Sequence, residues 1–316
     1  MAAPSTLPTV VPCPTFAPER AAEIAELLVG AVDLHCHSGP AAMPRILNHH
    51  EALMDAAAAK FAAVLYKDHF YPGMAHAQIL EGLFPDTGVK LFSGVALNNA
   101  VGGLNPYAVD HAIKLGGKIV WMPTFAAANH INAYAGAAKT FPKTAQKMLD
   151  PTALSVLDAN KKLTDETLQI LDLIAEGDII LAGGHLHVSE LFVLFEEARK
   201  RGVKRLMVNH PSYVIGCSDA DIRGLVALGA YMEHSICMFV ESRAKQHDMD
   251  DLAHLIAVAG VDHTILGSDL GLTQAPRPVD GYRMIVDQML DHQISRADIK
   301  KITSTNAAKL LGIAVN

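Results

Sequence analysis

Short apolar runs alternate with longer amphipathic stretches along most of this chain. The apolar runs have the length of strands and are apolar at successive positions, which is typical of strands that are covered on both faces. The stretches between them have helical spacing of apolar residues and carry helix start and stop signals. The predicted strands lie in AVDL (31–34), FAAVLY (61–66), VKLFSGVA (89–96), GKIVWM (117–122), DIILAGG (178–184), KRLMVN (204–209), GAYMEH (229–234) and HTILGS (263–268).

The predicted helices fill the spaces between these strands. The first runs from Glu19 to Val29, before any strand, and another starts at Ser189 and ends at Gly202. Strands that alternate with helices predict a parallel sheet, and eight such units in about 290 residues fit a closed (β/α)8 TIM barrel. A doubly wound open sheet is the alternative, but its glycine-rich first turn is missing, because the first turn reads HCHSGP.

One connection is unusually long. About 40 residues separate GKIVWMP from the helix TDETLQILDLIAEG, and long loops in compact domains are generally lids or small inserted elements. Within it, LSVLDANKKL predicts a small hairpin. Because the insertion follows the fourth strand, we expect a lid at the carboxyl-terminal rim of the barrel, where active sites of this fold lie.

Composition sets limits on the partners. The chain has 316 residues, half of them hydrophobic, and a net charge of −7 with acids and bases interspersed. This charge pattern argues against nucleic acid and membrane surfaces, and no apolar run is long enough to span a membrane. The four cysteines form no CxxC pair and predict reduced thiols in the cytoplasm.

The first eighteen residues contain five prolines and lack the pattern of a signal peptide. We expect residues 1–18 to form an extended arm that packs on the surface or on a neighbouring subunit of a homo-oligomer. Residues 19–316 then form one barrel domain.

Histidines recur where the predicted strands end. His35 and His37 follow the first strand, and because side chains alternate along a strand they share a face and can grip one divalent metal, typically zinc. Cys36 should point away from them. Asp33 should share their face one layer down, where its carboxylate could orient a ligand. The alternative is a pair of buried structural histidines.

Further ligand types end later strands, and metal binding is predicted for His185, His210 and Asp269. One alternative is that Asp269 only caps a helix, but in a closed barrel the last strand lies beside the first. Asp269 can then bind the metal and act as the base that deprotonates the attacking water.

The second strand ends in Lys67, Asp68 and His69. A lysine in an apolar strand usually extends its charged end toward water. Among metal ligands, Lys67 could instead be carboxylated by CO2 and bridge two ions, or act as an electrophile. His69 is a further candidate ligand. The candidate substrate contacts are His187, which could also be a ligand, together with Asn129, His130, Tyr134 and Glu233.

The order of these residues resembles the amidohydrolase superfamily of metal-dependent (β/α)8 enzymes. The closing segment ITSTNAAKLLGI is similar to that superfamily's last helix, and LSVLDANKKLTDETLQILDLIAEGDIILAGGHLHVSE resembles an uncharacterised branch of it. The resemblance implies His35, His37 and Asp269 at one metal subsite, with His185 and His210 at the other. Binuclear members carry a bridging Lys or Glu after the fourth strand, where this chain has WMPTF. Either Lys67 supplies the bridge, or only one metal is held firmly.

The leading hypothesis is a hydrolase in which a metal-activated water cleaves an amide, lactam or lactone bond of a small molecule. A one-metal site would resemble the decarboxylase and hydratase branch of the same superfamily. DLHCHS, KDHF and NHPS also resemble the polymerase-and-histidinol-phosphatase phosphoesterases, although other motifs of that family are missing. A barrel with a closed, purely structural metal site is the alternative that is not an enzyme.

Overall fold

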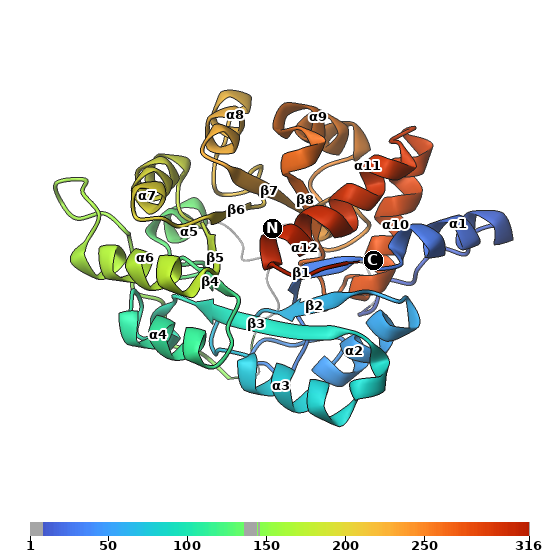
Figure 1. The fold of residues 1–316 in the computed structure, drawn as a ribbon, viewed down its shortest axis with the longest axis horizontal. Coiled ribbons are helices and arrows are strands. Elements are labelled where there is room, and N and C mark those ends of the chain that lie inside the picture. The colour runs from blue at the N-terminus through green and yellow to red at the C-terminus, as the bar shows by residue number, and fades with distance from the viewer. Residues whose placement is uncertain (1–8, 136–143, 145, 316) are drawn as a thin grey trace.

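Eight parallel strands form the centre of the molecule, arranged in chain order around one axis (Figure 1). The structure, a computed structural model, describes residues 9–135, 144 and 146–315. The strands are β1 (Val32–Cys36), β2 (Ala63–Tyr66), β3 (Lys90–Ala96), β4 (Ile119–Trp121), β5 (Ile180–Ala182), β6 (Arg205–Asn209), β7 (Ala230–Ser235) and β8 (Thr264–Gly267). Each of the eight predicted apolar runs overlaps one of them, and β1 and β7 continue one or two residues past the predicted run.

The sheet closes between its first and last strands. The amide of His37 donates to the carbonyl of Leu270 at 2.9 Å, and the amide of Asp269 donates to the carbonyl of His35 at 2.7 Å. This closure removes the sheet edges and confirms the predicted (β/α)8 barrel.

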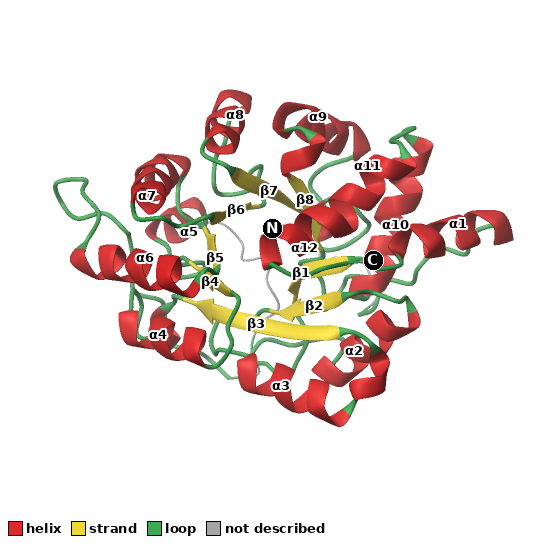
Figure 2. Cartoon of the chain, viewed as in Figure 1, coloured by secondary structure: helices red, strands yellow, loops and turns green. Residues whose placement is uncertain are grey.

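Helices surround the strands (Figure 2). They are α1 (Pro18–Leu28), α2 (His49–Ala58), α3 (Met74–Leu83), α4 (Pro106–Lys114), α5 (Ala128–Ala133), α6 (Asp165–Gly177), α7 (Val188–Lys200), α8 (Asp219–Ala227), α9 (Met249–Ala259), α10 (Pro278–Asp291), α11 (Arg296–Lys300) and α12 (Asn306–Leu311). Side-chain caps start several of them, as the sequence predicts. Asn48 caps α2 and Thr164 caps α6, for example. The predicted first helix, Glu19 to Val29, is α1.

Apolar side chains fill the barrel interior, and α12 closes the amino-terminal end of the barrel. Apolar side chains such as Leu34, Trp121 and Ile265 are fully buried there, and Ala307 and Leu311 of α12 pack against the same cluster. Figure 1 shows α12 lying across the ring of strands. Burying each such large side chain stabilises the fold by about 1.5–3 kcal/mol. Because this end is plugged, chemistry is confined to the opposite, carboxyl-terminal end of the strands.

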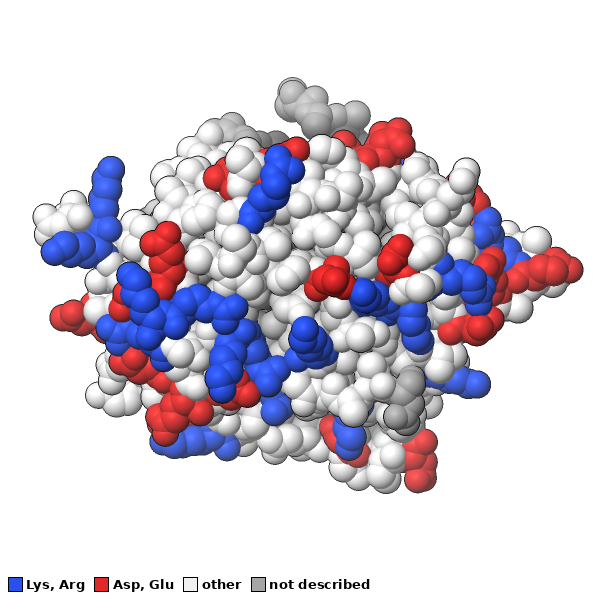
Figure 3. Space-filling model, turned by 45° about the horizontal axis from the view of Figure 1, so that its top comes forward, with Lys and Arg blue, Asp and Glu red and all other residues white. Residues whose placement is uncertain are grey.

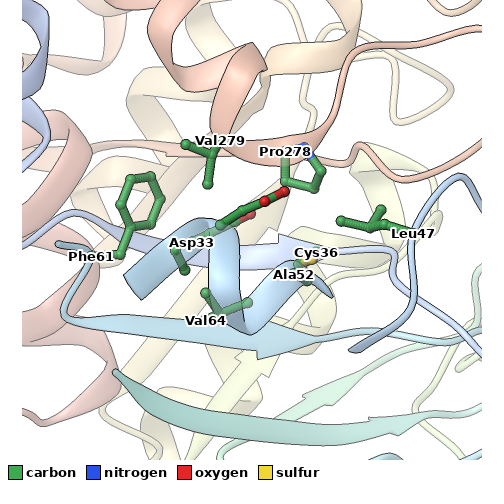
Figure 4. Close-up of a pocket in the computed structure, with 10 residues that line it drawn as sticks. Asp33, Cys36, Leu47, Ala52, Phe61, Val64, Pro278 and Val279 are labelled. Atoms are coloured by element: carbon green, nitrogen blue, oxygen red, sulfur yellow. The ribbon is translucent and has the colours of Figure 1, made fainter. Parts of the chain in front are cut away.

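A β-bulge in β1 corrects one prediction. Asp33 pairs with Val64 and Cys36 pairs with Tyr66, so β1 uses three steps where β2 uses two. The extra residue reverses the alternation of side chains. Asp33 therefore does not share a face with His35 and His37. It lines a cavity of about 10 Å³ outside the barrel together with Cys36, under α2 and α10 (Figure 4).

Two irregular segments pack against the carboxyl-terminal loops. After β4 the chain forms α5, and the predicted hairpin is present as a turn closed by an antiparallel bridge between Leu157 and Leu163. Residues 136–143 and 145 of the predicted lid lie outside the described residues, as do residues 1–8 of the arm. The described part of the arm runs beside the loop that follows β8, where Val11 donates to the carbonyl of Ala275 at 2.9 Å.

Charges on the surface are mixed. Figure 3 shows one face on which Lys and Arg form a band flanked by Asp and Glu. Pairs such as Arg201 with Asp172 and Arg205 with Asp178 contribute to the mixture. Within the described residues, no helix is both long and apolar enough to cross a membrane. The expectation that the chain binds no nucleic acid stays a prediction.

Candidate metal centre

Three ligand atoms converge where β1 meets β8. His35 Nε2 lies 3.3 Å and His37 Nε2 lies 3.0 Å from Asp269 Oδ1. Among the described residues, these three side chains form the group whose ligand atoms all lie within 4.8 Å of one another. Both imidazoles are 1% exposed, whereas the Asp269 side chain is 20% exposed. One ion could therefore contact all three groups, and solvent reaches the site on the side of Asp269.

A hydrogen bond from Nδ1 fixes the orientation of each histidine ring. His35 Nδ1 donates to Glu233 Oε2 at 3.0 Å, and His37 Nδ1 donates to the carbonyl oxygen of Lys67 at 2.9 Å. With the proton held on Nδ1, each Nε2 carries a lone pair. Metal-binding histidines in proteins are oriented in this way.

The backbone is strained at two of the candidate ligands. Asp269 has φ 48° and His210 has φ 30°, in the left-handed region that favours glycine. Such a conformation costs of the order of 1 kcal/mol or more and persists where the surroundings impose it. Here the amide of Asp269 is held by the His35 carbonyl and the amide of His210 by the Glu233 carbonyl, each at 2.7 Å. Strain of this kind clusters at functional sites.

His185 and His210 form a second group beside the first. Their ring centroids are 5.0 Å apart, and His210 lies 6.2 Å from His35. His185 Nδ1 shares a hydrogen bond with His130 Nδ1 at 2.8 Å. His210 Nδ1 is buried without a hydrogen-bond partner among the described residues. An orphaned buried nitrogen of this kind is what a missing ligand would satisfy.

The residues that follow β2 also lie at this end of the barrel. Lys67 Nζ donates to His35 Nε2 at 3.0 Å and lies 5.2 Å from the centroid of the Trp121 ring. His69 stacks on His37 with ring centroids 4.9 Å apart, and its Nδ1 is 2.9 Å from Thr124 Oγ1. Lys67 thus reaches the first group, and His69 flanks it.

Burial sets the protonation of the cluster. It lowers the pKa of His37 to about 3 and that of His210 to about 4, and it holds the pKa of His185 well below its usual range. Burial also lowers the pKa of Lys67 to about 8, against the opposing effect of the Asp269 and Glu233 carboxylates. Burial raises the pKa of Asp269, but His35, His37 and His210 outweigh it and the net shift is strongly downward.

These protonation states fit a divalent cation. Neutral imidazoles and an ionised carboxylate are the forms that bind metal, and together they are the ligand types that zinc takes in enzymes. Within the described residues, the first group therefore has the chemistry, the tautomers and the spacing for a metal.

The structure places two of the predicted substrate contacts elsewhere. His187 is exposed and caps α7, with its ring accepting from the amide of Ser189. The cap moves the helix start to Val188, one residue before the predicted Ser189. The Asn129 side chain donates to the carbonyls of His185 and Val214, so it ties two loops together.

The other three predicted contacts lie close to the histidines. His130 pairs with His185, and the Tyr134 hydroxyl is hydrogen-bonded to that of Tyr213, whose ring centroid is 5.3 Å from that of His210. Glu233 is fully buried behind His35. Burial raises the pKa of Glu233, but its electrostatic interaction with His35 and the hydrogen bond from His35 Nδ1 prevail and lower it to about 2. Its position is that of a ligand-orienting carboxylate, the role expected for Asp33.

One buried ion pair beside the site has no clear signal in the sequence. Arg45, in the loop after β1, donates to Asp68 Oδ2 at 2.9 Å, and both side chains are almost inaccessible. Asp68 also accepts from the amide of Phe70 at 2.8 Å. The pair fixes the loop after β1 against the residues that follow β2, and hence the surroundings of His37.

Solved structures described as a dipeptidase, an amidohydrolase and an organophosphorus hydrolase share the fold. The probable dipeptidase PvdM from Pseudomonas aeruginosa has a TM-score of 0.62 at 12% identity, covering 93% of this chain and 97% of its own. An amidohydrolase from Burkholderia multivorans with bound zinc has a TM-score of 0.53 at 13% identity, covering 90% and 99%. A mutant of organophosphorus hydrolase from Deinococcus radiodurans has a TM-score of 0.56 at 13% identity, covering 92% and 94%.

These likenesses confirm the predicted resemblance at the level of the fold. No curated protein matches the sequence. The model of one protein family, described as a family of unknown function (DUF6282), matches residues 30–233. That match includes β1 to most of β7, with His35, His37, His185 and His210. The chain belongs to this family, DUF6282.

Proposed function

We propose that this protein is a metal-dependent hydrolase that cleaves an amide, lactam or lactone bond of a small molecule with an activated water. The observation that carries the proposal is the convergence of His35 Nε2, His37 Nε2 and Asp269 Oδ1 on one point. Support comes from the fold, which matches a dipeptidase and an amidohydrolase with bound zinc.

A divalent cation, most simply zinc, would be held by these three residues and would lower the pKa of water from 15.7 to about 7. Asp269 is the group of the three that solvent reaches, so its carboxylate accepts the proton of the attacking water. It then passes that proton to the leaving group. His185 and His210 would hold a second ion or the polarised oxygen of the substrate.

A decarboxylase or hydratase with one metal is the second candidate. It is favoured by the end of β4, where Trp121 fills the barrel interior and contributes no bridging ligand. Lys67 could supply the bridge only if its amine is carboxylated. As it stands, its nitrogen donates to His35 Nε2.

The experiment is a turnover assay of zinc-loaded and manganese-loaded protein on panels of amides, lactams and lactones. Asp269→Asn is the matched inactive control, because Asn keeps the size of the side chain but does not accept a proton. Hydrolysis that the control lacks supports the proposal. Unsaturated acids and phosphate esters are assayed in parallel, and CO2 release or ester cleavage there without hydrolysis of the first panels would contradict the proposed hydrolase.

A further inference from the structure

The side chain of Glu233, on β7, connects the groups that surround the candidate metal site. Its Oε2 accepts from His35 Nδ1 at 3.0 Å and from Asn209 Nδ2 at 2.7 Å. Its Oε1 accepts from Ser235 Oγ at 3.1 Å. The carboxylate is therefore fully engaged on both oxygens, and it is 0% exposed.

The same network reaches the second histidine group. Asn209 Oδ1 accepts from the amide of Gly184 at 3.3 Å, and Gly184 directly precedes His185. The backbone carbonyl of Glu233 accepts from the amide of His210 at 2.7 Å. One residue on β7 is thus linked to candidate ligands, or to their neighbours in the chain, on β1, β5 and β6.

Gly267, at the end of β8, leaves room for this carboxylate because it has no side chain. A Cβ on Gly267 would lie 2.5 Å from Glu233 Oε1 and 2.9 Å from the Cβ of His35. Only the absence of a side chain at Gly267 allows Glu233 and His35 to lie where they do. Their contact is therefore part of the packing where the barrel closes.

We propose that Glu233 is a positioning residue, whose carboxylate holds the Nδ1 proton of His35 and thereby aims His35 Nε2 at the ion. The inference rests on the proposed function in so far as a metal occupies the first group. Carboxylate partners of this kind fix the tautomer of a metal-binding histidine and raise its basicity.

Two other roles fit the geometry less well. A substrate contact or proton-transfer group has to meet the reacting molecule, and Glu233 is fully buried behind the His35 ring. A purely stabilising role does not require Oε2 to face His35 Nδ1, and it would change the free energy of unfolding without changing metal affinity. The decisive readout is therefore metal affinity and His35 tautomer, not stability alone.

The first test is Glu233→Gln, with zinc affinity measured by competition with a chromophoric chelator. Gln has the same size and can still accept from His35, but it lacks the charge. We expect affinity to fall about 10-fold to 100-fold while the metal-free protein stays folded. Ser235→Ala is the matched control, since it removes the partner of Oε1 and leaves both hydrogen bonds of Oε2. Its affinity should stay within about threefold of wild type.

A folded Glu233→Gln protein that binds zinc within about twofold of wild type would overturn the proposal. If Glu233→Gln does not fold, Glu233→Asp keeps the charge and withdraws it from His35, and the same loss of affinity is expected. Nitrogen-15 NMR of the metal-free wild type separates this proposal from the proposed function. It should show His35 protonated on Nδ1, and a proton on Nε2 would refute the positioning role. A wild type that binds no metal would instead overturn the proposed function, whatever the tautomer.

Discussion

Gly267→Ala should damage the candidate metal site through one added methyl group. The new Cβ would lie 2.5 Å from Glu233 Oε1 and 2.9 Å from the Cβ of His35, whereas ordinary contacts of such an atom begin near 3.4 Å. The carboxylate must therefore retreat by about 1 Å. Gly267 is not among the residues with positive φ, so the effect is steric and adds no backbone strain.

The magnitude follows from the packing of the closed barrel. Overpacking a well-filled core costs about 1–3 kcal/mol, and the retreat of Glu233 also lengthens its 3.0 Å hydrogen bond to His35. We expect the free energy of unfolding of the metal-free protein, measured with urea, to fall by that amount. Zinc affinity, measured by chelator competition, should fall with it.

Gly82→Ala is the control, because nothing lies within 4 Å of the added Cβ and Gly82 is inside α3. It should raise stability by about 0.5–1 kcal/mol and leave zinc affinity unchanged. A Gly267→Ala protein with the stability and zinc affinity of wild type would refute the reasoning.

Three further predictions test single residues. Asp269→Asn should keep the fold and much of the metal but abolish turnover, and a variant with more than about a third of the wild-type rate would show that another group is the base. His234 lacks a hydrogen-bond partner on either ring nitrogen among the described residues, and burial lowers its pKa from 6.5 to about 4. As pH falls from 6.5 toward 4, His234 takes up a proton in the unfolded chain before it does so in the folded protein. The free energy of unfolding therefore falls over that window, by about 3 kcal/mol at most. Urea unfolding at pH 7 and pH 4.5 should show that loss in wild type and less of it in His234→Leu. For Lys67, mass spectrometry of native protein should detect carboxylation if the site is binuclear, and bicarbonate should then restore activity to metal-stripped protein, whereas a bare amine and one ion would favour the mononuclear branch.

The barrel could be predicted because the apolar runs carry the required signal directly. A strand buried on both faces has to be apolar at successive positions, and runs such as FAAVLY and KRLMVN meet this condition within a few residues. The segment AGGHLHVSE was harder to predict, because its pattern does not reveal where the turn after β5 ends and the next helix begins. From the sequence, His187 could be either a substrate contact or a second ligand; in the structure it caps α7.

The site was predictable where position along a strand decides it. His35, His37 and Asp269 come together because parallel strands end at the same rim and the first and last strands are neighbours. The partner of His35 was not predictable, because one extra residue in β1 turns Asp33 out of the barrel. Glu233 on β7 takes that place, in a pairing between residues 198 positions apart that no local pattern contains.

Metal content tests the central claim most directly. Protein expressed with supplemented zinc, dialysed and measured by elemental analysis, should hold about one equivalent or more per chain. The His35→Ala and His37→Ala double variant should hold none and stay folded by circular dichroism, since most of the core is aliphatic. Less than about a tenth of an equivalent in the wild type would contradict the account.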